Sequence, residues 1–149
     1  MGLIVNRPLT IPLSKVLPAK FLPKGSGGTL HQGGPVQPDH LLLVHGIDVE
    51  GLNQHPVCEG TFLGGDLEVL KKVLGGSKVP LLLRCFLGYA GWSPGQLEEE
   101  VAQGAWISRP ARPQEVFGTD AGTLWARLIG TQAGARPDPY GKPQGPELN

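Results

Sequence analysis

The apolar positions along the chain fall into short runs that are separated by polar, glycine-rich or proline-rich stretches. Apolar runs of strand length occur at Leu3–Val5, His40–His45 and Leu81–Leu87, and a looser alternation covers Val57–Leu63. Short apolar runs bounded by turn residues are typical of buried strands. The pattern therefore predicts several short strands, with Leu81–Leu87 at the centre of a sheet.

Helical spacing appears in only a few places. Leu13–Leu17 is long enough for one or two helical turns before Pro18. Asp66 and Asp120 each precede apolar residues three or four positions apart, which is typical of N-cap residues. We expect the first of these helices to end at Gly75–Gly76. In the second, the side chains expected to face the core are Leu124, Trp125 and Leu128.

The clearest local signal is Ser93-Pro94-Gly95-Gln96. A serine followed by proline and, at the third position, glutamine predicts an N-cap with a capping box. The helix would run to about Gln103, with Gly104 as the left-handed residue after it. We expect Leu97 and Val101 on its inner face.

The remaining segments complete the organisation of the chain. Residues 105–107 predict a short strand in which Trp106 is buried between two helices. The sequence predicts loops at residues 18–38 and 47–56. Within the first loop, we expect Gly25–Gly28 to be mobile. Residues 133–149 lack apolar periodicity and predict a disordered tail. We therefore expect one α+β domain over residues 1–132, followed by that tail.

Composition excludes several classes of protein. The 23 glycines and 15 prolines argue against an all-helical bundle,. The formal net charge of zero argues against direct nucleic-acid binding, which relies on phosphate neutralisation,. No apolar run is long enough to span a membrane. Cys58 and Cys85 form no CxxC pair, and no signal peptide is visible. We therefore expect two small strand residues in a protein of the reducing cytoplasm.

Two glycine-rich segments could in principle hold a ligand. The turn Gly88–Gln96 leads from a strand to a helix N-terminus, where free N–H groups can bind an anion. It has no P-loop lysine and does not fit GxGxxG, and the adjacent Glu98–Glu100 would repel phosphate,. Gln32–Val36 could form one wall of a pocket. We favour a structural turn at both segments.

The four histidines, His31, His40, His45 and His55, show no metal-ligand spacing,. We therefore expect no metal and no cofactor. No Gly-x-Ser-x-Gly elbow occurs. A catalytic Cys–His dyad that joins His45 to Cys58 or Cys85 remains an open alternative.

Three segments together resemble the AlgH/YqgE family of bacterial proteins: Met1–Pro8, then Gly33–Val36 with the following Leu43–His45, and Gly88–Glu100 with Ala105–Trp106. The resemblance covers about residues 1–130. It implies an α/β fold with a split, pseudo-barrel β-sheet flanked by short helices. The family is often labelled a transcriptional regulator, but the resemblance carries over no catalytic residue. Neither the family nor this chain has a recognisable helix-turn-helix.

The resemblance also concerns the start of the chain. Family members usually begin about 30 residues earlier, which would make the whole protein roughly 180 residues long. We therefore expect this chain to lack N-terminal strands. An apolar groove would then lie open beside Leu3–Val5.

These observations favour a non-enzymatic binding or regulatory module for a protein, a peptide or a small molecule. Aromatic residues on glycine-rich turns commonly anchor partners. One alternative is an enzyme that uses Glu98 or Glu100 near His45, and another is a sequence-specific DNA-binding protein. The candidate groove residues are Asn6, Arg7, Gly34, Pro35, His45, Tyr89, Trp92, Gln96, Glu98 and Glu100.

Overall fold

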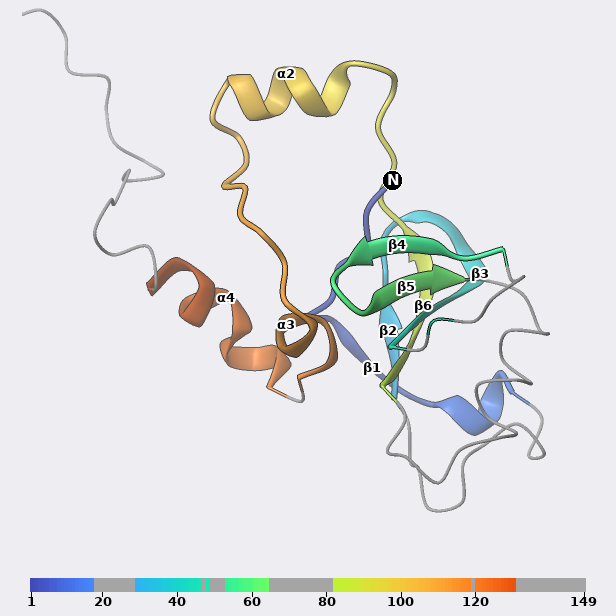
Figure 1. Cartoon of the computed structure of the whole chain (residues 1–149). Helices are drawn as coiled ribbons and strands as arrows, with labels where there is room; N and C mark the ends of the chain where they lie inside the picture. The colour runs from blue at the N-terminus through green and yellow to red at the C-terminus, as the bar shows by residue number, and fades with distance from the viewer. Residues whose placement is uncertain (18–28, 47, 49–52, 65–81, 119, 131–149) are drawn as a thin grey trace, which may run out of the picture.

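The computed structural model describes residues 1–17, 29–46, 48, 53–64, 82–118 and 120–130. Its centre is a mixed six-stranded sheet with the strand order β1-β2-β6-β3-β5-β4 (Figure 1). The elements are β1 (Pro8–Pro12), the 3-10 helix η1 (Leu13–Lys15), β2 (Thr29–Gln32), β3 (Val36–His45), β4 (His55–Cys58), β5 (Thr61–Gly64), β6 (Leu83–Tyr89), α2 (Gln96–Ala102), α3 (Pro113–Phe117) and α4 (Ala121–Gly130). The fold class is therefore α+β, as predicted.

Both faces of the central strands are covered, which explains why their sequences are largely apolar. One face packs against η1 and buries Leu13, Leu17, Leu30, Leu43 and Cys85. The opposite face packs against α3 and buries Leu42, Val44, Phe86 and Val116. Alternating residues of β3 and β6 thus enter two separate apolar layers.

The sheet is open rather than barrel-like, so the expected pseudo-barrel is wrong. In the described part of the chain, β1 pairs only with β2 and β4 pairs only with β5. β2 runs parallel to β6, whereas the other pairs are antiparallel. The outermost strands therefore lie at opposite edges of the sheet.

Gly33 and Gly34, which follow β2, cross the end of β6 in direct backbone contact. A Cβ atom added to Gly33 would lie 2.1 Å from the carbonyl oxygen of Gly88, and one added to Gly34 would lie 2.1 Å from the carbonyl carbon of Tyr89. Gly88 itself has a φ of 68°. The Gly33-Gly34 pair is therefore a close crossing between strands, and glycine is needed there for space.

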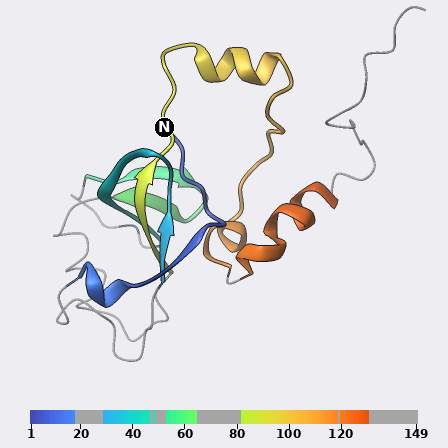
Figure 2. The same ribbon diagram turned by 180° about the vertical axis from the view of Figure 1, so that it is seen from behind.

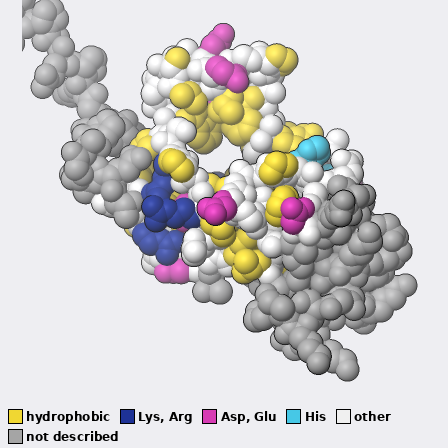
Figure 3. Space-filling view, viewed as in Figure 1, with side chains coloured by type: hydrophobic (Ala, Val, Ile, Leu, Met, Phe, Trp, Pro, Cys, Tyr) yellow, Lys and Arg dark blue, Asp and Glu magenta, His cyan; other side chains and the backbone are white. Residues whose placement is uncertain are grey.

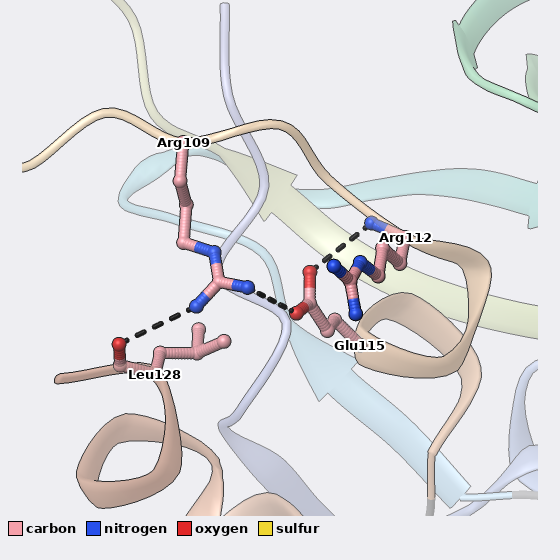
Figure 4. A network of polar contacts seen from close by, with 4 residues as sticks. All are labelled: Arg109, Arg112, Glu115 and Leu128. Atoms are coloured by element: carbon pink, nitrogen blue, oxygen red, sulfur yellow. Dashed lines mark hydrogen bonds and ion pairs between the residues drawn. The ribbon is translucent and has the colours of Figure 1, made fainter. Parts of the chain in front are cut away.

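The C-terminal helices are fastened by a small polar network around Glu115 (Figure 4). Arg109 donates to Glu115 Oε1 at 2.9 Å and to the carbonyl oxygen of Leu128 at 3.4 Å. Glu115 Oε2 accepts the backbone N–H of Arg112 at 3.1 Å. This network joins residue 109 to both α3 and α4.

The predicted helix after Asp120 is confirmed as α4. The N–H of Thr123 donates to Asp120 Oδ1 at 3.2 Å, so Asp120 is its N-cap,. Leu124 is buried and Leu128 is half-buried. Trp125 is 65% exposed, however, and its expected core position is wrong. No helix of the described residues is long and apolar enough to cross a membrane.

Several other predictions are also corrected. Leu3–Val5 is not a strand: the neighbouring Gly2 forms an isolated bridge with Ala90, and within the segment Ile4 N–H donates to the Gly33 carbonyl oxygen at 2.9 Å. The predicted strand over residues 57–63 is a hairpin of β4 and β5, and Gly60 at its turn has a φ of 62°. The sequence patterns also missed β1, β2 and α3.

The helical turn near Leu13 and the strands around residues 40–45 and 81–87 are confirmed. Both cysteines lie on strands, where Cys85 is buried and Cys58 is half-buried. The predicted helix at residues 66–76, Gly25–Gly28 and the tail from residue 133 lie outside the described residues.

Candidate functional site

Residues 91–108 leave β6, carry α2 and return to the body of the protein near α3; we call this segment the α2 arch. Figures 1 and 2 show α2 standing away from the sheet in both views. No side chain of α2 is buried, and Val101 is 43% exposed. Leu97 and Val101, which we expected on the inner face of the helix, are therefore not buried in the core.

Both feet of the arch are fastened to the body. At the first foot, Gly2 and Ala90 exchange two backbone hydrogen bonds of 2.9 and 2.8 Å. The Trp92 ring lies over Gly2, where an added Cβ would be 3.1 Å from the ring. At the second foot, Arg109 is held by Glu115 and α4. The arch is thus a positioned element of the fold.

The entrance to α2 is a β-turn and not the predicted N-cap. Gly95 has a φ of 80° and a ψ of −17°, and the N–H of Gln96 donates to the Ser93 carbonyl oxygen at 3.0 Å. Proline followed by a left-handed glycine defines a type II turn. The helix therefore begins at Gln96, two residues later than the predicted start at Pro94. One half of the expected box is present, because Ser93 N–H donates to Gln96 Oε1 at 3.0 Å. The predicted left-handed Gly104 after the helix is confirmed, with a φ of 74°.

Glu100 is the centre of the arch. Its carboxylate accepts hydrogen bonds from Trp106 Nε1 at 2.7 Å, Gln96 Nε2 at 2.9 Å and Trp92 Nε1 at 3.1 Å. These donors, Trp106 first, lower the pKa of Glu100 below its usual value,. The ionised carboxylate therefore closes the arch by joining the segments before and after α2.

The two tryptophan rings meet edge to face, with their centroids 5.8 Å apart. Trp106 and Ile107 are each 49% exposed. The predicted buried strand at residues 105–107 is wrong, because no described strand pairs with this segment. Trp106 lies on the arch, where its polar edge is satisfied by Glu100 and its ring is open to solvent.

The arch is apolar on the side that faces the sheet. Figure 3 shows hydrophobic side chains gathered there, above a hollow, and acidic side chains on the outer side. The exposed apolar residues of the arch include Val101, Trp106 and Ile107. Residues 91–108 also hold Glu98, Glu99 and Glu100 but no lysine or arginine. The arch thus combines an aromatic apolar side with a net negative charge.

The structure brings together only some of the residues singled out from the sequence. Trp92, Gln96 and Glu100 meet in the arch, and Glu98 is exposed on α2. Outside the arch, Gly34 lies against the Tyr89 backbone just before its first foot, Asn6 is half-buried, and Arg7 and Pro35 are exposed. Trp106 is the member of this cluster that sequence reasoning placed elsewhere.

His45 lies at the other end of the sheet. It pairs with Leu83 at the start of β6, whereas the arch begins after Tyr89. At the usual rise per residue, a strand from Leu83 to Tyr89 spans about 20 Å. His45 is fully buried, and its ring stacks on Phe62 at 6.1 Å. The structure therefore does not bring His45 together with Glu98 or Glu100.

Metal-binding and nucleophilic chemistry find little support in the part of the chain that the structure describes. No group of three His, Cys, Asp or Glu side chains there could hold a metal ion. Burial raises the pKa of the Cys85 thiol to about 12, so this thiol stays protonated at neutral pH,.

Comparisons with known proteins place the chain in a family. A model of the AlgH-like family matches residues 1–136. A UPF0301 protein of Chlorobium luteolum is 36% identical over 152 residues, which cover 100% of this chain and 78% of the relative. A UPF0301 protein of Myxococcus xanthus is 37% identical over 128 residues, which cover 84% of this chain and 69% of the relative.

Solved structures share the fold. The solution structure of the AlgH protein from Pseudomonas aeruginosa matches with a TM-score of 0.67 and 27% identity, over 91% of this chain and 73% of that one. The crystal structure of DIP2367 from Corynebacterium diphtheriae, at 23% identity, matches with a TM-score of 0.62 over 91% of this chain and 70% of that one. This chain belongs to the AlgH-like family.

Proposed function

We propose that this protein is a non-enzymatic binding module that exerts a regulatory role by docking a partner polypeptide on the α2 arch. The observation that carries the proposal is Trp106, which is held in place by Glu100 and still has half of its surface exposed. Exposed apolar patches mark interaction sites, and tryptophan is enriched among residues that dominate binding energy. A fixed ring also loses little conformational freedom on binding.

The chemistry of the arch indicates the kind of partner. Its exposed apolar side chains, Val101, Trp106 and Ile107, favour an apolar segment of the partner. The glutamates of α2 are not balanced by a cation within residues 91–108. The complementary ligand is therefore an apolar peptide segment flanked by lysine or arginine.

The enzymatic alternative gains no support from this arrangement. It requires Glu98 or Glu100 beside His45, but His45 pairs with the start of β6, whereas both glutamates lie on α2, beyond the end of that strand. The carboxylate of Glu100 is already occupied by three hydrogen-bond donors. Two free cysteines are in keeping with a cytoplasmic setting for the binding module,.

A phage-displayed library of random peptides, selected on the immobilised protein, tests the proposal. We expect enriched peptides that combine an aromatic or aliphatic core with basic flanks. In titrations followed by NMR, these peptides should shift the indole N–H signals of Trp92 and Trp106. The affinity should fall at high salt, because the charged contacts are at the surface.

Two tryptophan variants give a matched comparison. Trp106→Ala should weaken the selected peptides at least tenfold, which corresponds to about 1.4 kcal/mol. Trp125→Ala removes another exposed indole, on α4, and should leave the affinity unchanged. Peptides that bind Trp106→Ala as tightly as the unchanged protein would rule out the arch as the docking site.

A further inference from the structure

A second hollow lies beside the first residues of β2 and β6 and has no lining residue from the α2 arch. This pocket has a volume of about 340 Å³. It is lined by groups from β2 and β6, by Leu13 of η1 and by the first residue of α4. A volume of this size is within the range of small-molecule sites. The lining residues used below are Thr29, His31, Arg84, Phe117 and Ala121.

Arg84 is a buried cation in this pocket, with 8% of its surface exposed. Its Nη1 donates to the carbonyl oxygen of Val5 at 2.7 Å, and its Nη2 donates to the carbonyl oxygen of Gly118. A guanidinium has five N–H donors. The other three have no partner among the described residues, and no described carboxylate forms an ion pair with Arg84.

A buried charge without a counter-charge is costly, because the protein interior solvates it poorly. The two carbonyl oxygens offset part of this cost, since they carry partial negative charge. They do not neutralise the guanidinium. Among the described residues, Arg84 is therefore a cation with hydrogen-bond donors left over, at the wall of a hollow.

His31 supplies a second polar group to the same pocket. Its Nδ1 lies 3.2 Å from the carbonyl oxygen of Thr29 and donates to it,. The ring packs against Phe86 with centroids 5.6 Å apart. Burial and then the charge of Arg84 lower the pKa of His31, so the ring is neutral at pH 7. The pocket thus holds one fixed positive charge beside a neutral imidazole.

We propose that this pocket binds a small organic anion, with its carboxylate or phosphate on Arg84 and its apolar body against Phe117. The planar guanidinium fits both kinds of anion. The apolar lining from Leu13, Leu83 and Phe117 requires a ligand that also has a nonpolar part. This site is independent of the peptide-docking function proposed for the arch.

Benzoate and phenyl phosphate are the probes, because each joins an anionic group to an apolar ring. Inorganic phosphate tests the charge alone, and benzyl alcohol tests the apolar ring alone. In NMR titrations of the whole chain, we expect at least one of the two joined probes to shift the Arg84 Nε–H and His31 ring signals. It should bind at least tenfold more tightly than either partial probe. The preference between benzoate and phenyl phosphate identifies the anionic group.

Ala121→Phe is the decisive variant, because it fills the pocket from α4 without altering Arg84. It should weaken the better probe at least tenfold. Arg84→Met should do the same where it folds. Arg112→Met is the control, since Arg112 lies on a separate surface with Arg109 and Arg127. Probe binding that persists in Ala121→Phe, that disappears in Arg112→Met, or that is absent at 10 mM probe overturns the proposal.

Discussion

Gly33 lies against Gly88 so closely that a single added methyl group would come within 2.1 Å of the Gly88 carbonyl oxygen. The N–H of Gly33 donates to the carbonyl oxygen of Leu87 at 2.8 Å, which fixes this approach. The crossing joins the end of β2 to the end of β6, immediately below the first foot of the α2 arch. The backbone there has no room to shift without breaking this hydrogen bond.

We therefore expect Gly33→Ala to destabilise the protein by about 3 kcal/mol or more, as forced steric clashes in a core do. Urea denaturation measures this change. Gly122→Ala is the matched control, because Gly122 lies within α4 and an added Cβ there meets nothing within 4 Å. That variant should stabilise the protein by about 0.5–1 kcal/mol. Equal midpoints for the two variants would contradict the close crossing.

The central strands were predictable because a strand that is buried on both faces has a run of apolar residues in its sequence. The apolar run in residues 41–44 and the run around Leu83–Leu87 have this origin. β1 and β2 were not predictable, since they contain proline, histidine and glutamine and derive their pairing from neighbours far along the chain. The open sheet was missed because strand order is not encoded in local pattern.

The type II turn at the entrance of α2 gives a second prediction. Gly95→Ala should lower stability by about 1 kcal/mol, because a φ of 80° is strained for alanine,. Ser93→Ala should change stability by less than about 0.5 kcal/mol, since Ser93 is not the N-cap. Thermal melts of the two variants check this difference. An equal or larger loss in Ser93→Ala would restore serine as the N-cap.

The orientation of α2 could not be derived from its sequence. The spacing of Leu97 and Val101 shows that the helix has an apolar side, but not whether the sheet or a partner covers it. Trp106 was misplaced for the same reason, because a large apolar side chain is most often buried. Arg84 did leave a signal: a lone charge within the longest apolar run requires a buried partner or ligand.

The Glu100 carboxylate provides a third prediction, on its acidity. Trp106→Phe keeps an aromatic ring but removes the indole N–H. Of the three donors to Glu100, this one lowers the pKa of the carboxylate most. The pKa of Glu100 should therefore rise in this variant, as followed by carboxyl-carbon NMR. The pKa of Asp120, which is lowered by Thr123, should not change. Identical Glu100 titrations in both proteins would show that Trp106 does not donate to this carboxylate.

His31 predicts how stability depends on pH. Its pKa in the folded protein lies below the ordinary 6.5, first because of burial and then because of Arg84. As the pH falls through 6.5, the unfolded chain therefore binds a proton before the folded protein does, and the free energy of unfolding decreases,. His31→Gln removes this contribution but keeps a polar side chain. Urea denaturation between about pH 7.5 and pH 5 should show a steeper loss for the unchanged protein than for His31→Gln, because only the former takes up this proton on unfolding. Parallel curves would mean that His31 has the same pKa in the folded and unfolded states. That result would contradict the conclusion that Arg84 and burial keep the His31 ring neutral.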